Sequence, residues 1–143
     1  MYERILFPTD GSDGADAALE HAVDLACTYD ARLYVLYVAD TNRDSVTVVE
    51  GDVVDALEAE GESVVAAAAQ RARGRGVDTE TDVLQGDPPD TILDYVDQRD
   101  IDLIVMPTRG RQGLDRYLLG SVTERVLRTA SAPVLAVRMD GGE

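Results

Sequence analysis

A glycine-rich segment, residues 107–121, holds the residues of this chain best suited to binding chemistry. Gly110, Gly113 and Gly120 would let main-chain N–H groups approach a ligand closely, and Gly120-Ser121 opens a helical pattern. The first N–H groups of a helix lack partners within the helix and carry a partial positive charge. The segment therefore predicts a site for an anion such as a phosphate.

The charges in this region favour the same interpretation. Between residues 107 and 128, five arginines (109, 111, 116, 125 and 128) stand against Asp115 and Glu124, a local balance of +3. The whole chain has a formal net charge of −15, so the remainder carries −18. An alternative needs no ligand, because Ser121-Val-Thr-Glu124 also matches the S-x-x-E capping box that satisfies a helix N-terminus by itself.

The composition excludes several kinds of catalysis. All 13 cations are arginine, and a chain without lysine can form neither a P-loop GK[ST] nor a lysine Schiff base. The single histidine, His21, and the single cysteine, Cys27, exclude a His-pair metal site and an internal disulfide. We expect His21 at a helix surface and Cys27 as a small buried residue. Ser12 and Ser121 have no nearby general base, so we assign no catalytic and no metal-ligating residue.

The excess of acidic residues indicates which partners to expect. With 28 aspartates and glutamates, the chain should be repelled by nucleic acids and by anionic membranes. The lysine-free, acidic composition resembles that of proteins from halophilic archaea, although an ordinary acidic cytosolic protein remains the alternative. The first apolar run, Ile5–Phe7, is far shorter than the ~7–15 residues of a signal peptide, so we expect a cytoplasmic protein.

Short apolar runs alternate with helical patterns along the whole chain. Strands are predicted at residues 4–7, 32–39, 77–84, 102–106 and 134–138. Apolar residues at three- and four-residue spacing predict helices at residues 13–29, 52–73, 88–99 and 121–129. The run 77–84 alternates polar and apolar residues and is typical of an edge strand. The alternation predicts one α/β domain over residues 1–143, a three-layer, doubly wound parallel sheet with helices on both faces.

In such a sheet, ligands bind outside the carboxyl ends of the strands, where the strand order reverses. The loops after the first, second and fourth predicted strands are therefore the relevant ones. They begin with Pro8–Ser12, Ala39–Thr41 and Pro107–Ser121, so the glycine-rich segment belongs to this end of the sheet.

Segments in this order resemble the universal stress protein A family. They are ILFPTDGS (5–12), YVAD (37–40), the Gly86-x-Pro88 turn, VMPTRGRQGL (105–114), LLGSVTERVL (118–127) and APVLAVR (132–138), and they span Glu3–Arg138. The resemblance implies a five-stranded parallel sheet of order 3-2-1-4-5, of the adenine nucleotide alpha hydrolase-like type. It also implies a homodimer through the last strand, Val134–Arg138.

ATP-binding members of this family share a motif of the form G-x2-G-x9-G-[ST]. Gly110, Gly120 and Ser121 match the later positions, with nine residues between the two glycines, but Pro107 replaces the first glycine. Proline has no N–H group, so a contact made by that amide is lost. The changed position is the one nearest the ribose and base, and we therefore expect the nucleotide site to survive.

By position, the resemblance assigns the contacts to the ribose and base. Asp10 would accept hydrogen bonds from the ribose hydroxyls, and Pro8 and Thr9 would border the base. Val38 and Met106 would pack on its two faces. Each also has an ordinary interpretation, Asp10 as a cap or turn residue and the two apolar side chains as strand-end core.

The resemblance also assigns the phosphate contacts. Main-chain N–H groups would come from Gly110, Gly120, Ser121 and Val122, with further contacts from the Ser121 hydroxyl, Thr123 and Arg109. ATP is the expected ligand, with ADP or AMP as alternatives, and Mg²⁺ would accompany the phosphates rather than occupy a protein cage.

The sequence thus predicts an adenine-nucleotide-binding sensor or regulator of a stress response. Catalysis would be limited to slow ATP hydrolysis or autophosphorylation at Ser121, because no residue set for phosphoryl transfer is evident. The alternatives are a regulatory dimer that binds no nucleotide, an enzyme like the wider adenine-nucleotide α-hydrolases, and a flavodoxin-like FMN binder. The last is disfavoured because the key loops offer only Tyr117 to stack on a flavin.

Overall fold

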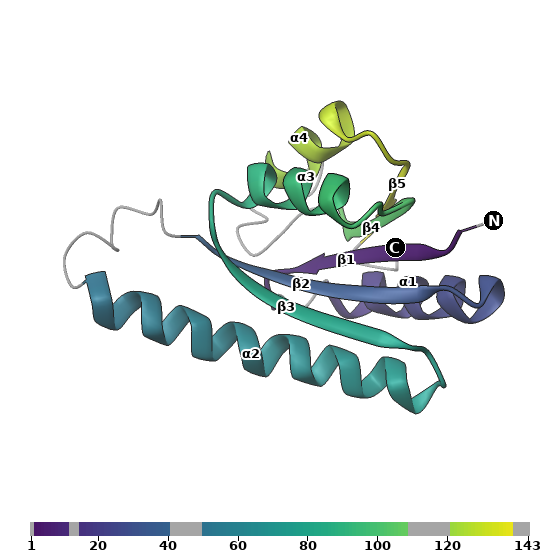
Figure 1. Cartoon of the computed structure of the whole chain (residues 1–143), viewed down its shortest axis with the longest axis horizontal. Coiled ribbons are helices and arrows are strands. Elements are labelled where there is room, and N and C mark those ends of the chain that lie inside the picture. The colour runs from purple at the N-terminus through teal and green to yellow at the C-terminus, as the bar shows by residue number, and fades with distance from the viewer. Residues whose placement is uncertain (1, 12–14, 41–49, 109–120, 139–143) are drawn as a thin grey trace.

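The computed structural model describes residues 2–11, 15–40, 50–108 and 121–138, and Figure 1 shows their arrangement. Strands and helices alternate along the chain, as predicted. The elements are β1 (Arg4–Thr9), α1 (Ala15–Tyr29), β2 (Arg32–Asp40), α2 (Glu50–Gly74), β3 (Thr79–Gly86), α3 (Pro88–Gln98), β4 (Leu103–Pro107), α4 (Ser121–Thr129) and β5 (Val134–Val137).

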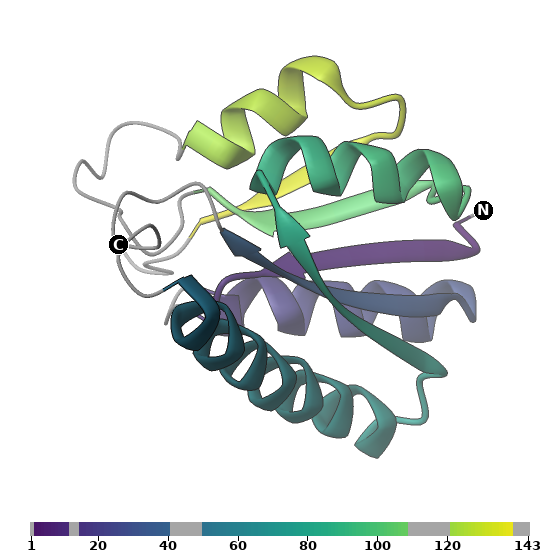
Figure 2. The same cartoon turned by 60° about the vertical axis from the view of Figure 1, so that its left-hand side comes forward.

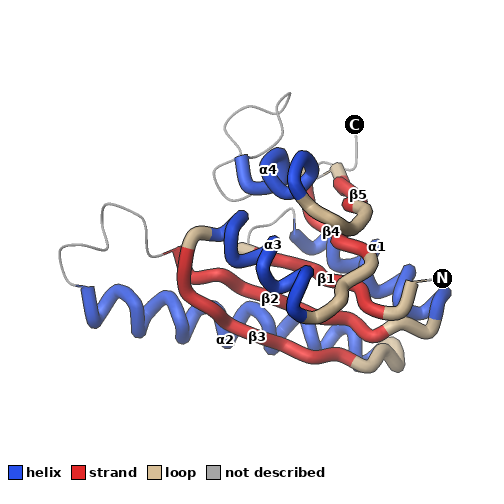
Figure 3. The backbone as a smooth tube through the Cα atoms, turned by 45° about the horizontal axis from the view of Figure 1, so that its top comes forward, coloured by secondary structure: helices blue, strands red, loops and turns tan. Residues whose placement is uncertain are grey.

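The five strands form one parallel sheet of order β3-β2-β1-β4-β5, which confirms the predicted topology. Figure 3 shows β3 at one edge of the sheet and β5 at the other. Helices α1 and α2 cover one face, and α3 and α4 cover the other (Figures 1 and 2). The molecule is therefore the expected three-layer α/β sandwich.

The central strands are buried on both faces and divide their side chains between two cores. Residues at alternate positions, such as Phe7, Val35 and Val105, pack toward α1 and α2. Their neighbours in sequence, such as Leu36 and Met106, pack toward α3 and α4. This division follows from the two-residue period of a strand.

Strand β1 is longer than predicted, because it continues through Pro8 to Thr9 rather than ending at Phe7. Pro8 pairs with Leu36 of β2, whereas the pairing of β1 with β4 ends at Leu6 and Ile104 within the described residues. A residue without an N–H group is tolerated here because no ladder continues toward β4. The two central strands consequently separate at their carboxyl ends.

Other predicted boundaries differ by one or two residues, among them the end of β4 at Pro107 rather than Met106 and the ends of β2, α2, β3 and α3. Strand β3 begins at Thr79 rather than Val77, because the Val77 N–H donates to the Ala72 carbonyl at 3.1 Å and closes the end of α2. Strand β4 begins after Asp102, whose carboxylate accepts the Glu3 N–H at 2.9 Å. Strand β5 ends at Val137, one residue before the predicted end.

The prediction that Cys27 is buried was also wrong, because its side chain is exposed. On α1, Ala22 and Ala26 face the sheet and are almost fully buried. Cys27 follows Ala26 and is therefore turned about 100° away from that face. His21 is exposed on the same helix.

Helix α2 fits against β2 through a glycine. A Cβ atom at Gly61 would lie 2.5 Å from the Tyr37 ring, and Tyr37 is only 4% exposed. At Gly74, by contrast, a Cβ atom would meet no atom within 4 Å. Gly61 therefore permits the close approach that seats Tyr37 under α2.

This difference predicts opposite effects for two matched substitutions. Gly61→Ala should lower the free energy of unfolding by about 1 kcal/mol or more, because overpacking a core costs roughly 1–3 kcal/mol and outweighs the helix propensity gained. Gly74→Ala should raise it by up to about 1 kcal/mol. Urea unfolding of both variants would measure these values, and a stabilised Gly61→Ala variant would refute the packing account.

Candidate functional site

The carboxyl ends of β1, β2 and β4 gather several of the predicted site residues. Because Thr9 pairs with Tyr37, the end of β1 lies beside Val38 on β2. Val38 and Val122 pack against the same hydrophobic cluster that contains Met106. Residues from β2, β4 and α4 thus join one apolar cluster near the end where β1 and β4 stop pairing.

This end of the sheet combines buried and accessible groups. Pro8 is buried and Met106 is 4% exposed, whereas Thr9, Asp10 and Val38 are half-buried. The Thr9 hydroxyl accepts the Gly11 N–H at 3.1 Å and closes a turn directly after β1. Gly11 has φ +79°, a conformation that favours glycine.

Helix α4 directs its N-terminus toward the same end of the sheet. Its first residue, Ser121, is exposed, and Val122 is half-buried. Thr123 is 3% exposed, and its hydroxyl donates to the Pro107 carbonyl at the end of β4 at 2.9 Å. The sequence assigned Thr123 to the phosphates and gave no signal of this hydrogen bond, which joins residues 16 positions apart.

The proposed capping box has little support in the described residues. Ser121 is itself the first residue of α4, whereas a capping box needs it one position before the helix. The Glu124 carboxylate pairs with Arg128 at 3.1 Å. The Glu124 carboxylate is thus held by an ion pair within the helix.

Of the five arginines counted in the sequence, the two that lie in the described residues, Arg125 and Arg128, have structural partners. Arg125 pairs with Asp90 of α3 at 2.9 Å, and Arg128 pairs with Glu124. The predicted anion contacts Arg109, Gly110 and Gly120 lie outside the described residues. The described part of the site therefore consists of the strand ends and the first turn of α4.

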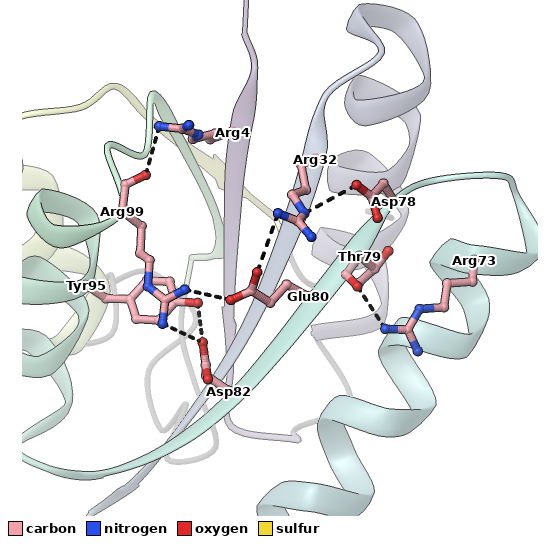
Figure 4. Close-up of polar contacts among 9 residues, drawn as sticks. All are labelled: Arg4, Arg32, Arg73, Asp78, Thr79, Glu80, Asp82, Tyr95 and Arg99. Atoms are coloured by element: carbon pink, nitrogen blue, oxygen red, sulfur yellow. Dashed lines mark hydrogen bonds and ion pairs between the residues drawn. The ribbon is translucent and has the colours of Figure 1, made fainter.

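A second polar cluster lies on β3 and α3, shown in Figure 4. The Tyr95 hydroxyl donates to Asp82 at 2.6 Å, and Arg99 binds Glu80 at 2.6 Å and Asp82 at 3.3 Å. The Arg99 guanidinium also lies 4.8 Å from the centre of the Tyr95 ring. Burial, together with the hydrogen bond to Asp82, raises the pKa of Tyr95 above its ordinary value. Because these groups satisfy one another, we interpret the cluster as a structural link between α3 and β3.

A cleft of about 440 Å³ opens at the opposite, amino end of the sheet. Both of its arginines are paired, Arg32 with Asp78 at 3.3 Å and Arg75 with Asp24 at 2.9 Å. The Cys27 thiol contacts the Arg75 carbonyl at 3.7 Å. The lining residues are Glu3, Ala26, Cys27, Asp30, Ala31, Arg32, Arg75, Gly76, Val77 and Asp78. Ligands of parallel α/β sheets bind at the other end, so this cleft is not the predicted site.

The described residues contain neither a candidate metal centre nor a helix that could span a membrane. No three histidine, cysteine, aspartate or glutamate side chains in these residues are grouped as they would be around a metal ion. No described helix has the length and the apolar character needed to cross a bilayer.

Comparison with known proteins agrees with the geometry. A family model described as the universal stress protein family matches residues 1–138. Universal stress protein MJ0531 of Methanocaldococcus jannaschii is 38% identical over 141 residues, covering 96% of this chain and 83% of that protein.

Solved structures have the same fold. The structure of MJ0577, from the same organism, is 29% identical with a TM-score of 0.89 and covers 99% of each chain. A universal stress protein in complex with cAMP is 26% identical with a TM-score of 0.77, covering 97% of this chain and 99% of that one. An Archaeoglobus fulgidus universal stress protein in complex with dAMP is 26% identical with a TM-score of 0.70, covering 94% and 97%. On the family model and on the relative at 38% identity, this chain belongs to the universal stress protein family.

Proposed function

We propose that this protein binds an adenine nucleotide at the carboxyl ends of β1, β2 and β4 and acts as a sensor or regulator in a stress response. The observation that carries the proposal is that Val38, Met106 and Val122, from β2, β4 and the first turn of α4, pack in one apolar cluster at the carboxyl end of the sheet. An apolar cluster beside the first turn of a helix suits a ligand with a flat base at one end and a phosphate at the other.

The base and ribose would occupy the strand ends. Val38 and Met106 offer aliphatic and thioether groups to the faces of a purine, and Pro8 and Thr9 border it. Asp10, half-buried directly after β1, would accept hydrogen bonds from the ribose hydroxyls. The complexes of two family members with cAMP and dAMP support an adenine base.

The phosphates would lie at the first turn of α4. The N–H groups of Ser121 and Val122 and the Ser121 hydroxyl are the described donors, and Gly110, Gly120 and Arg109 would add to them. ATP is our preferred ligand, with ADP and AMP as alternatives, and Mg²⁺ would be held mainly by the phosphates. Turnover would be slow ATP hydrolysis or autophosphorylation at Ser121 at most, because we identify no general base for phosphoryl transfer.

A second candidate is a regulatory dimer that binds no nucleotide. Pro107 favours it, because proline stands where the ATP-binding motif has its first glycine and offers no N–H group. The two candidates differ in one measurable property, the affinity for adenine nucleotides.

Isothermal titration calorimetry with ATP, AMP and adenosine tests the proposal. The protein should bind all three ligands. Asp10→Asn should lower the affinity for AMP and for adenosine at least about tenfold, about 1.4 kcal/mol, because the carboxylate acceptor is lost. Asp30→Asn, at an exposed position at the other end of the sheet, is the matched control and should leave both affinities unchanged. Absence of binding to the unchanged protein at millimolar ATP and AMP would favour the second candidate.

We also propose a homodimer through β5. The two sheet edges differ in charge, because β3 carries Glu80 and Asp82 in ion pairs, whereas β5 (VLAV) has no charged residue and leaves Leu135 37% exposed. Leu127 on the adjacent α4 is 40% exposed and extends the apolar surface. An apolar edge strand readily pairs with a second copy.

Sedimentation at molar salt tests the dimer. The protein should sediment at twice its chain mass of 15.4 kDa, and Leu135→Asp should yield monomers because it places a charge in the interface. Leu84 on β3 is the matched control, because it is also a leucine and is about as exposed as Leu135. The Leu84→Asp variant should remain dimeric. A monomeric unchanged protein would contradict the model.

We further propose that the protein is cytoplasmic and adapted to high salt. The chain has 28 acidic residues and 13 arginines, so the arginines cannot neutralise all of the negative charge, and a net charge of −15 remains. Molar salt reduces the Debye length to about 3 Å and so screens this repulsion. The melting temperature should therefore rise from dilute buffer to about 3 M KCl, and a constant value would contradict the adaptation.

A further inference from the structure

One peptide unit, Pro107–Thr108, connects α4 to β5 at the end of β4. Its carbonyl accepts the Thr123 hydroxyl at 2.9 Å, and its N–H group donates to the Val137 carbonyl at 2.8 Å. Because a peptide unit is planar, the two hydrogen bonds together fix its orientation. Proline at position 107 also fixes φ, so this part of the chain has little freedom to turn.

Thr123 is placed to orient the helix rather than to contact a ligand. Its side chain is 3% exposed, and its hydroxyl proton is committed to Pro107. Ser121 and Val122 precede it in the same helical turn, so the hydrogen bond sets where their N–H groups lie relative to β4. A second link, Arg125 with Asp90, joins two exposed side chains and constrains the helix far less.

We propose that Thr123 is a positioning residue, which locks the first turn of α4 over the end of β4 so that its N–H groups face the phosphate. This inference rests on the proposed nucleotide site and adds to it a residue that acts without touching the ligand. The Thr123 hydroxyl would therefore control the affinity for the phosphate and leave the affinity for the nucleoside unchanged.

Two substitutions separate the hydroxyl from the shape of the side chain. Thr123→Val keeps the branched shape, but it leaves the Pro107 carbonyl without its donor, so the first turn of α4 can shift. Thr123→Ser keeps the hydroxyl and removes a methyl group. Val23→Ala, in the α1 core on the opposite face of the sheet, is a control for general destabilisation, because Val23 is 3% exposed.

Calorimetric titration with AMP and with adenosine tests the positioning role. Thr123→Val should weaken AMP binding about tenfold, since an unsatisfied buried acceptor disturbs the donors that depend on it. Its affinity for adenosine should stay within about twofold of that of the unchanged protein, and Thr123→Ser should stay within about threefold for AMP. Val23→Ala should lower the melting temperature without changing either affinity.

Amide hydrogen exchange provides a second readout, which reports on the Pro107–Thr108 peptide unit without any ligand. The Thr108 N–H donates to Val137 and belongs to the peptide unit that Thr123 holds, so it should exchange faster in Thr123→Val. In Thr123→Ser and Val23→Ala, the ratio of the Thr108 exchange rate to that of the neighbouring core amides should equal the ratio in the unchanged protein.

The outcomes distinguish this inference from the function on which it rests. If the unchanged protein binds neither AMP nor ATP, the nucleotide function fails and the positioning role falls with it. If the unchanged protein binds AMP and Thr123→Val binds it equally well, the positioning role is overturned and the nucleotide function stands. An equal loss for adenosine, or an equal loss of AMP affinity in Val23→Ala, would also overturn it.

Discussion

The separation of β1 from β4 at their carboxyl ends is the constraint on which the candidate site depends. The strands pair at Leu6 and Ile104 and then diverge within the described residues. Pro8, two residues further along β1, has no N–H group with which to continue a ladder toward β4. In parallel sheets this reversal of strand order is where ligands bind, because the helices that follow the two strands lie on opposite faces. Here α1 follows β1 on one face and α4 follows β4 on the other.

Charged side chains of the protein form ion pairs that connect its secondary-structure elements. Arginines at positions 4, 32, 71, 75, 99, 125 and 128 form ion pairs in the described residues. Several of these pairs connect different elements, including α1 with α2 and β3 with α3. Exposed pairs of this kind are individually weak, at about 0–1 kcal/mol. Their concentration on β3 nevertheless gives that edge a charged character, whereas β5 remains apolar, so the two edges of one sheet differ in how readily they accept another strand.

The sequence predicted what depends on local pattern and could not predict what depends on distant neighbours. Hydrophobic periodicity predicted the element order, and the limits of α4 at Ser121 and Thr129 were correct. The strand order came from the family resemblance, since periodicity carries no information about which strands are adjacent. The extension of β1 through Pro8 was missed because it depends on where pairing with β4 stops. The burial of Cys27 was inferred from its residue type, whereas the residue lies outside the apolar face of α1 that the periodicity defines. The bond from Thr123 to Pro107 spans 16 positions and has no local signature.

Proline at position 107 is compatible with the architecture, because it lies in an extended strand that pairs with β5 at Val137. Glycine is favoured where φ is positive, as at Gly11, Gly76 and Gly86, whereas the proline ring holds φ at about −65°. The peptide unit that Pro107 begins uses both of its polar groups, the carbonyl with Thr123 and the following N–H with Val137. Proline in place of the motif glycine therefore removes one N–H donor, while the hydrogen bonds to Thr123 and Val137 still fix the peptide unit that follows. A change of this kind acts on the affinity of a site and leaves the fold that builds the site intact.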